Sequence, residues 1–204
     1  MKFTNNNVDA IRALNPAPDS ILAYILRENE RSLTMDYWKE HFEWVELASR
    51  YQPQYVLDFG SGSGCPALFL ASAGFFVLGY DKDPDMVAAA NLICSVQSDE
   101  IKRRCSFTAT MPTPNRYHFP LIWISHTLEH IPLDEWPEVF EALKSLGDTV
   151  FISVPEDHAY DSPGHVNHWP HMEVFVADLK PYVAKFNVME RDGPRNVFRV
   201  EATL

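Results

Sequence analysis

The feature that most constrains this chain is a glycine-rich turn that separates two short apolar runs. Residues 55–64 read YVLDFGSGSG and residues 76–84 read FVLGYDKDP. Each run is typical of a buried strand, and each ends near an acid, Asp58 in the first and Asp81 in the second. Glycines that connect a strand to a helix let the backbone come very close to a bound molecule. The pattern therefore predicts a strand–turn–helix–strand unit that holds a ligand.

The spacing of the glycines and acids narrows the kind of ligand. Asp81 lies 21 residues after Gly60, at a place where an acid can accept both hydroxyl groups of a ribose. Dinucleotide enzymes usually show the spacing G-x-G-x-x-G, whereas Gly60, Gly62 and Gly64 alternate. Asp58 also places negative charge where a diphosphate would lie, which opposes diphosphate binding. A nucleoside-bearing ligand with an amino group and a sulfonium fits the pattern better.

The rest of the chain alternates between apolar runs typical of strands and segments with helical periodicity. The expected strands are residues 55–59, 75–80, 106–110, 121–125, 150–154, 186–189 and 197–202. The expected helices are residues 65–73, 84–94, 138–146 and 174–183. Such alternation predicts βαβ units and a mostly parallel sheet. Residues 1–50 are predicted to form a helical cap on the domain at residues 51–204, so that the two make one structural unit.

Composition limits the partners and the location of the protein. The 204 residues suit one domain, and the formal net charge of −11 argues against a general nucleic-acid binder, which needs basic patches. Three cysteines without paired spacing predict reduced thiols. The N-terminus has no signal-peptide core, and no apolar run approaches the roughly 18 residues that span a membrane. We therefore expect a soluble, cytoplasmic protein without a membrane or nucleic-acid partner.

Four segments carry a resemblance to a known family. VLDFGSGSG at residues 56–64 resembles the first motif of the class I S-adenosylmethionine-dependent methyltransferases, an acid followed by G-x-G-x-G, and GYDKDPDMV at residues 79–87 resembles the second. LIWISHTLEHI at residues 121–131 is similar to the strand-four motif of the small-molecule, type 11-like subgroup. Residues 154–170 resemble the loop after strand five in that subgroup. The resemblance covers about residues 50–204.

The resemblance implies an α/β fold with a Rossmann-like, mostly parallel seven-stranded sheet, helices on both faces and an N-terminal helical cap. It implies S-adenosyl-L-methionine as the cofactor. Asp58 would fix the glycine loop and the methionine amino group. Gly60, Gly62 and Gly64 would let the backbone approach the methionine and ribose parts, and Asp81 would hold the ribose hydroxyls.

Four further residues are expected at the cofactor through the same resemblance: Ser61, Lys82, Thr110 and Ser125. Lys82 stands where the family usually has an apolar residue against the adenine ring. The family often has an acid after its third strand, near the adenine amino group, whereas this chain has Thr108 and Thr110 there. A hydroxyl or a backbone group would have to replace that acid, or cofactor binding would be weaker.

Histidines are concentrated in one part of the chain, with six of the eight between residues 126 and 171. His126 follows the strand at residues 121–125, and parallel sheets bind ligands at that edge. A histidine there can take a proton from an acceptor hydroxyl or amine, so His126 is the predicted catalytic base. His130 is a predicted substrate contact. The alternative for Glu129 and His130 is that they only orient this loop.

His165 and His168, in the sequence GHVNHW, are also predicted to contact substrate. Together with Asp161 nearby they resemble metal ligands, but their spacing is not that of a metal motif, and we predict no metal site. The structural alternative is an ordered loop that packs through Trp169 and Val166.

These observations predict a methyltransferase that uses S-adenosylmethionine and acts on oxygen or nitrogen of a small-molecule acceptor, with a sugar or glycan precursor as one candidate. Two alternatives stay open at this stage. One is a catalytically silent binding or interaction module with the same fold, and the other is a nucleotide-dependent oxidoreductase. The sequence contains no indication of the oligomeric state.

Overall fold

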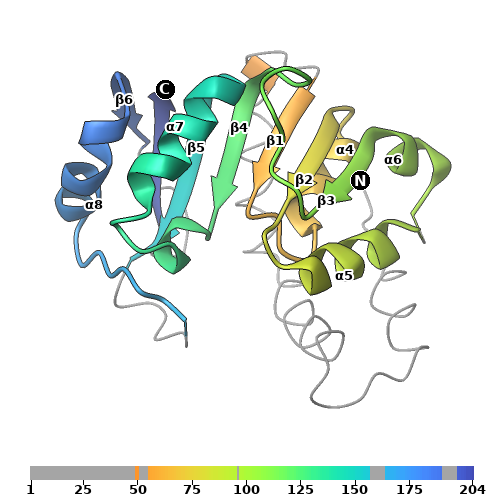
Figure 1. The fold of residues 1–204 in the computed structure, drawn as a ribbon, viewed down its shortest axis with the longest axis horizontal. Helices are drawn as coiled ribbons and strands as arrows, with labels where there is room; N and C mark the ends of the chain where they lie inside the picture. The colour runs from red at the N-terminus through yellow and green to blue at the C-terminus, as the bar shows by residue number, and fades with distance from the viewer. Residues whose placement is uncertain (1–48, 51–54, 96, 157–163, 190–196) are drawn as a thin grey trace. The chain divides into compact units, whose positions relative to one another are not determined.

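The structure is a computed structural model that describes residues 49–50, 55–95, 97–156, 164–189 and 197–204. Seven strands form a mostly parallel sheet in the order β3-β2-β1-β4-β5-β7-β6 (Figure 1), which confirms the expected α/β fold. The chain divides into two compact units, a first unit at Met1–Gln52 and Ser61–Met111 and a second unit at Pro53–Gly60 and Pro112–Leu204. The helical cap predicted at residues 1–50 lies outside the described residues, apart from residues 49 and 50.

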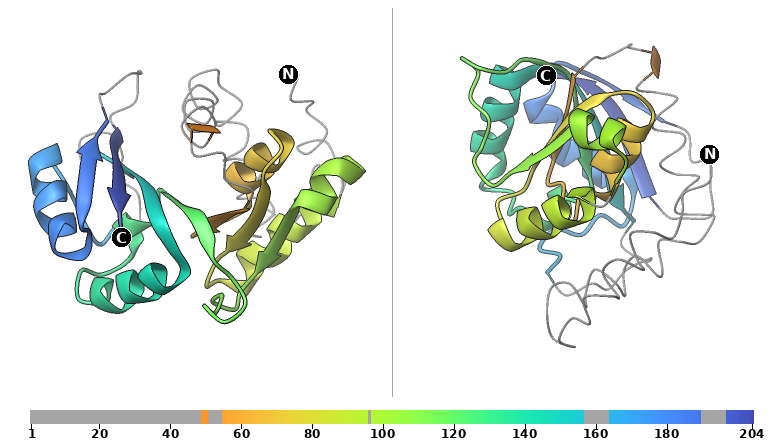
Figure 2. Two further views of the ribbon diagram at one scale, coloured as in Figure 1. Left: turned by 90° about the horizontal axis from the view of Figure 1, so that it is seen from above. Right: turned by 90° about the vertical axis from the view of Figure 1, so that its right-hand side faces the viewer.

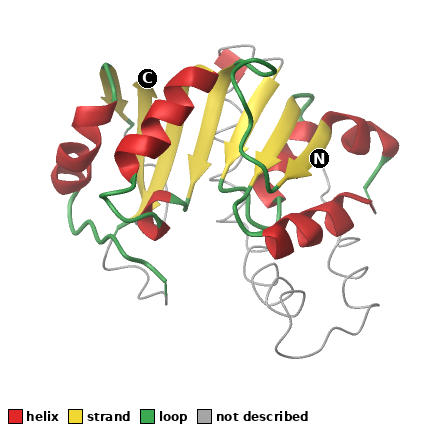
Figure 3. Ribbon diagram, in the orientation of Figure 1, coloured by secondary structure: helices red, strands yellow, loops and turns green. Residues whose placement is uncertain are grey.

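Within Ser61–Met111, the first unit contains two parallel strands and three helices that contact them (Figure 3): β2 (Phe76–Tyr80), β3 (Cys105–Thr108), α4 (Cys65–Ser72), α5 (Pro84–Ser95) and α6 (Asp99–Arg104). Helix α4 is apolar on nearly every side and buries five consecutive residues. Pro66 lies in its first turn, where proline costs no hydrogen bond. Gly74 follows its end with a φ of 109°, the left-handed conformation that commonly ends a helix. Both features match the predicted bounds of this helix.

Helix α6 is an element that the sequence did not predict. Its six residues, DEIKRR, bury no side chain and show no apolar face. The Ser98 hydroxyl accepts a hydrogen bond from the Ile101 N–H at 3.4 Å, acids occupy the first turn and bases the last, and Lys102 pairs with Asp99 at 2.7 Å. A capping side chain and charges that oppose the helix dipole stabilise a short helix without hydrophobic periodicity.

The second unit is built around three parallel strands, β1 (Tyr55–Phe59), β4 (Phe119–Ser125) and β5 (Gly147–Pro155). Strand β7 (Val197–Thr203) pairs antiparallel with β5, and β6 (Lys185–Val188) pairs antiparallel with β7. The connecting helices are η1 (Leu128–His130), α7 (Trp136–Leu146), α8 (Met172–Leu179) and η2 (Lys180–Tyr182), and α7 packs against β5 (Figure 2). The central strands carry the fully buried residues Val56, Leu57, Leu121, Ile122, Ile124, Val150, Phe151 and Ile152. Continuous apolar runs of this kind are typical of parallel strands covered on both faces.

Aromatic side chains attach the segment that follows residue 164 to the helices of the second unit. Trp169 is 1% exposed, and its ring centroid lies 6.0 Å from that of Trp136 in α7 and 5.0 Å from that of Phe175 in α8. Its indole N–H donates to Asp178 Oδ2 at 2.9 Å. Aromatic pairs contribute about 0.5–1.5 kcal/mol each beyond area burial. The expected packing of Trp169 is therefore confirmed, whereas Val166 is 53% exposed and the expectation for that residue was wrong.

Several element boundaries differ from the sequence-based expectation, and two of the differences have an identifiable physical reason. Strand β5 begins at Gly147, three residues before the expected 150–154, and directly follows α7. A side chain at Gly147 would collide with the carbonyl oxygen of Phe119, which pairs opposite it in β4. The helix expected at residues 174–183 ends at Leu179, and Pro181 lies in the 3-10 turn η2. None of the described helices has the length and apolar character needed to cross a membrane.

Candidate active site

The carboxylate of Asp81 and the glycine loop meet in the first unit. The N–H of Gly62 donates to Asp81 Oδ2 at 2.8 Å, and the N–H of Asp83 donates to Oδ1 at 2.9 Å. The N–H of Ser61 donates to the carbonyl of Tyr80 at 2.9 Å, which attaches the loop to the end of β2. An ionised carboxylate offers about four acceptor positions, and these two backbone bonds occupy one on each oxygen. Asp81 is therefore oriented by the backbone and retains acceptor capacity for two hydroxyl groups.

The three glycines have left-handed backbones but different surroundings. A Cβ at Gly60, whose φ is 76°, would collide with the side chain of Thr127. A Cβ at Gly64, whose φ is 83°, would lie 2.5 Å from Phe107 Cζ and 3.0 Å from Ala90 Cβ. A Cβ at Gly62, whose φ is 51°, would meet no atom of the described residues within 4 Å, its chain neighbours aside. The protein's own packing requires glycine at positions 60 and 64. Gly62 is therefore the glycine that leaves open space for a ligand.

The other cofactor residues expected in the first unit differ in how they are presented. Lys82 and Thr110 are exposed. The Thr110 N–H donates to Thr108 Oγ1 at 3.0 Å, so the Thr108 hydroxyl belongs to a local turn after β3. Ser61 is 4% exposed, and a Cβ built at Gly79 would lie 3.0 Å from its hydroxyl oxygen. The Ser61 side chain thus lies against β2, and its backbone is the part that belongs to the loop.

Asp58 and Ser125 belong to neighbouring strands of the second unit. Asp58 is 1% exposed and pairs opposite Trp123 of β4. The Ser153 hydroxyl donates to Ser125 Oγ at 2.9 Å. Thr127, which the sequence reasoning missed, directs its hydroxyl at the carbonyl oxygens of Phe59, Gly60 and Ser125 at 3.1–3.4 Å. This hydroxyl joins the ends of β1 and β4. No sequence pattern points to Thr127, and its role is visible only from these contacts in the structure.

His126 occupies a strained position directly after β4. Its φ is 52°, which is the only positive value among the described residues other than glycine. Its N–H donates to the Ser153 carbonyl at 2.9 Å, and its Nδ1 lies 3.5 Å from Glu129 Oε1. Left-handed backbone costs an L-residue about 1–2 kcal/mol, and such strain is concentrated at functional sites. The structure thus places the predicted base on a strained backbone beside the buried carboxylate of Glu129.

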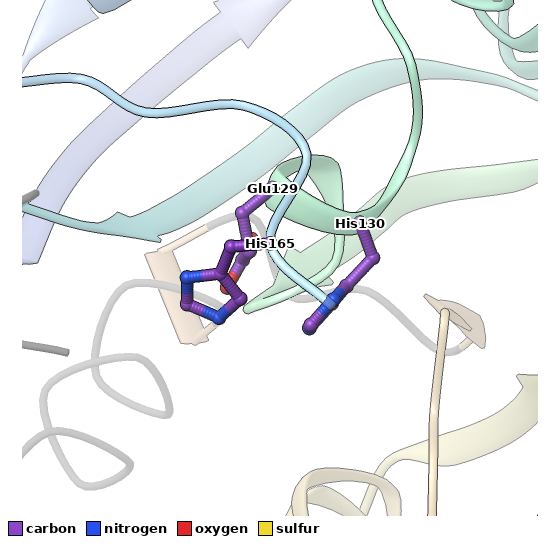
Figure 4. Close-up of side chains that lie close together, drawn as sticks. All are labelled: Glu129, His130 and His165. Atoms are coloured by element: carbon purple, nitrogen blue, oxygen red, sulfur yellow. The ribbon is translucent and has the colours of Figure 1, made fainter. Parts of the chain in front are cut away.

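Glu129, His130 and His165 lie close together at the edge of the second unit (Figure 4). Glu129 and His130 come from η1, and His165 comes from the segment that follows Gly164. The imidazole rings of His130 and His165 have centroids 4.8 Å apart at 74°, and His130 Nδ1 donates to the Gly164 carbonyl at 3.0 Å. The pKa of His165 is lowered. Burial is the largest cause and lowers the pKa, whereas the nearby carboxylate of Glu129 has a smaller, opposite effect and raises it. The lowered pKa keeps this imidazole neutral, and therefore able to donate a lone pair, down to a more acidic pH than usual.

Asn167 holds the two segments of this cluster together. Its buried side-chain amide donates to the carbonyls of Leu128 at 2.8 Å and Ile131 at 2.6 Å. The backbone N–H groups of Val166 and Asn167 donate to the Glu129 carbonyl at 2.8 and 3.2 Å. Sequence reasoning missed Asn167 because an asparagine in a loop carries no signal of a contact almost 40 positions away. His168 is exposed and lies farther out, with its ring centroid 6.5 Å from that of His165. Asp161 lies outside the described residues.

Comparison with known proteins adds independent findings. The sequence model of a family described as a methyltransferase domain matches residues 27–189. No curated protein matches the chain. Its fold is similar to the methyltransferase domain of bacterial CtHen1-CN, with a TM-score of 0.65 and 15% identity over 83% of this chain and 100% of that one.

Two further solved structures are similar at comparable levels. The glycopeptide N-methyltransferase MtfA complexed with S-adenosyl-L-homocysteine has a TM-score of 0.61 and 17% identity over 78% of this chain and 87% of that one. Magnesium protoporphyrin IX methyltransferase (ChlM) from Synechocystis PCC 6803, also with bound S-adenosyl-L-homocysteine, has a TM-score of 0.61 and 15% identity over 98% of this chain and 95% of that one. At these identities the likeness shows the fold.

Proposed function

The chain belongs to the methyltransferase-domain family, and we propose that it transfers a methyl group from S-adenosyl-L-methionine to oxygen or nitrogen of a small-molecule acceptor. S-adenosylmethionine is the cofactor of this family. Membership in the family argues against the alternative of a nucleotide-dependent oxidoreductase. The observation that carries the proposal is the carboxylate of Asp81, which the Gly62 and Asp83 N–H groups orient at 2.8 and 2.9 Å. This arrangement suits a ribose.

The residues of the glycine loop fit the expected cofactor. The open space beside Gly62 allows a ligand to approach the backbone, and the adjacent carboxylate accepts hydroxyl groups. S-adenosylmethionine supplies a methyl group already activated by a sulfonium. The protein therefore has to align the acceptor and exclude water, because the donor needs no further activation. The role of Asp58 at the methionine amino group remains part of this proposal.

We assign proton acceptance to His126. As the acceptor oxygen or nitrogen bonds to the methyl carbon, the carbon–sulfur bond would break and S-adenosylhomocysteine would leave. The proton of the acceptor would pass to Nε2 of His126, the ring nitrogen that does not face Glu129. The buried Glu129 carboxylate at 3.5 Å from Nδ1 would stabilise the imidazolium that forms. A neutral histidine can perform this step near physiological pH.

His130, His165 and His168 are the proposed contacts of the acceptor. These side chains are exposed or half-buried, and they offer hydrogen-bond donors and acceptors on two segments that lie together, η1 and the segment after Gly164. Hydroxyl-rich molecules such as sugars and glycan precursors are therefore the first class to screen. Transfer of a radiolabelled methyl group to a member of such a panel would identify the acceptor.

The cofactor part of the proposal is tested by titrating the purified full chain with S-adenosylhomocysteine in a calorimeter. Hydrogen bonds to charged groups contribute about 1.5–3 kcal/mol and are not additive, so Asp81→Ala should cost about 2–4 kcal/mol, roughly 30- to 700-fold in affinity. Asp85→Ala is the matched control, because it removes a nearby exposed carboxylate in the first turn of α5.

Failure of the wild-type chain to bind either S-adenosylmethionine or S-adenosylhomocysteine would contradict the proposal and favour a silent module. A loss below about threefold in Asp81→Ala, or an equal loss in Asp85→Ala, would mean that the ribose is held elsewhere. Circular dichroism of each variant shows whether the fold is intact.

A further inference from the structure

The structure places three metal-ligating side chains together in the second unit. Glu129, His130 and His165 each contribute one potential ligand atom, and these atoms all lie within 4.8 Å of one another. We propose that they bind a divalent first-row transition-metal ion. The proposal does not depend on methyl transfer, because it concerns an ion that binds the second unit without cofactor or acceptor.

The buried carboxylate of Glu129 is the first argument for an ion. Glu129 is 1% exposed, and neither of its oxygens accepts a hydrogen bond from the described residues. The imidazole of His126 lies nearby, with 3.5 Å between Glu129 Oε1 and His126 Nδ1. A buried carboxylate is costly unless it is paired, hydrogen-bonded or bound to a metal. A cation between Glu129 and the two histidines would offset this cost.

The donor set is the second argument. Two imidazoles and one carboxylate form a well-known ligand combination for zinc and for other first-row ions, whereas calcium and magnesium prefer oxygen ligands alone. Metal–nitrogen and metal–oxygen distances of about 2.0–2.2 Å require ligand atoms roughly 3–3.5 Å apart. The present spacing of up to 4.8 Å is therefore closed by side-chain movements of about 1 Å, within the reach of ordinary rotamer adjustment.

Backbone contacts hold the ligands in place, which is the third argument. The Val166 N–H donates to the Glu129 carbonyl at 2.8 Å, and this bond brings the neighbouring His165 to η1. His130 Nδ1 donates to the Gly164 carbonyl at 3.0 Å, a bond of the type that orients metal-bound imidazoles. The two segments lie 35 positions apart in the chain, yet their ligands converge (Figure 4).

The exposure of the cluster decides how an ion would be reached and used. Glu129 is buried, His165 is half-buried and His130 is exposed, so the ion would enter from solvent on the side of His130. Three protein ligands leave at least one coordination position for water or for an oxygen of a bound molecule. A site with an open position differs from a purely structural site, which surrounds its ion with four protein ligands.

The test is a calorimetric titration of the full chain with zinc chloride alone, after treatment with a chelator and dialysis. We expect one zinc ion per chain. His165→Ala and Glu129→Gln should each weaken zinc binding at least about 100-fold, because even indirect partners of metal ligands change affinity by 10- to 100-fold. Cobalt in place of zinc should give visible absorption bands that both variants lose.

The matched control is His118→Ala, which removes an exposed histidine paired with Asp148 at 3.1 Å elsewhere in the second unit. Zinc affinity should change less than about threefold in this variant. Equal affinity in wild type, His165→Ala and Glu129→Gln would overturn the proposal, and so would an equal loss in His118→Ala, which indicates adventitious binding to surface histidines. His165→Ala keeps the test valid if the buried Glu129→Gln variant does not fold, since His165 is only half-buried.

Discussion

The glycine loop and the histidine cluster solve the problem of holding a ligand in different ways. The loop of the first unit uses backbone N–H groups and one carboxylate, Asp81, with bonds of 2.8 and 2.9 Å already in place. The cluster of the second unit uses side chains from two segments, which Asn167 and backbone bonds hold together. Cofactor binding by the loop should therefore be weakened by substitutions that fill the space beside Gly62 or remove Asp81. Metal binding by the histidine cluster, which comprises Glu129, His130 and His165, should be weakened by substitution of any ligand or supporting contact.

The largest expected effect is that of Gly62→Val, which should abolish cofactor binding by the loop without affecting the histidine cluster. Valine at this position projects into the open space beside the loop, so S-adenosylhomocysteine binding should fall below detection in calorimetry. The protein should remain folded, because the new Cβ would meet no described residue within 4 Å beyond its chain neighbours, and the left-handed backbone costs only about 1–2 kcal/mol. Zinc binding by the histidine cluster should be unchanged.

Gly74→Val is the control for backbone strain. Gly74 also has a positive φ, 109°, but it lies after the other end of α4. This variant should lose stability to a similar extent and keep its cofactor affinity. Unchanged affinity in a folded Gly62→Val would refute the assigned role of the loop.

The next effect tests whether His126, which lies beside the histidine cluster, performs chemistry. His126→Ala should lower turnover by about 100-fold, the lower end of the usual contribution of a general base, while cofactor affinity changes less than about threefold. Turnover and cofactor binding are measured separately, once an acceptor is identified. Full activity in this variant would leave alignment alone as the mechanism.

A smaller effect is expected from the support of the cluster. Asn167→Ala removes two buried hydrogen bonds to the carbonyls of Leu128 and Ile131, which keep one bond each, from the Ile131 N–H at 3.2 Å and from the Trp136 indole N–H at 3.0 Å. The free energy of unfolding should fall by about 2 kcal/mol, as determined by urea denaturation. Zinc affinity should fall with it, whereas Asn91→Ala, which removes a single amide bond of 3.0 Å within α5, should cost less than about 1 kcal/mol. Equal losses in the two variants would mean that Asn167 has no special role in holding the segments together.

The smallest effect concerns His168, an exposed histidine outside the cluster of Glu129, His130 and His165. His168→Ala should raise the KM of the acceptor a few-fold and leave kcat nearly unchanged, since a contact equally strong in ground and transition states affects binding alone. Steady-state kinetics with the identified acceptor would measure both values. A fall in kcat larger than the rise in KM would instead place His168 in the chemical step.

Local patterns determined most of what the sequence could predict. The strand at residues 55–59, the helix that starts at Cys65 and the position of Asp81 are confirmed, because apolar runs, a first-turn proline and glycines act within a few residues of the chain. The same reasoning missed α6, whose stability depends on capping and charge without apolar periodicity. It also extended a helix past Leu179, where Pro181 forces a tighter turn.

The sequence by itself therefore determined the family, the positions of most strands along the chain and the acid that faces the glycine loop. These features depend on residues that are close together in the chain. Only the tertiary structure decided which glycine leaves space for a ligand, because that depends on Thr127, Phe107 and Ala90 in other elements. It also decided that His165 meets Glu129 and His130, whereas the sequence analysis considered His165 together with His168 and Asp161 and predicted no metal site. Contacts between distant segments arise from packing and buried hydrogen bonds, and a single sequence carries no local signal for them.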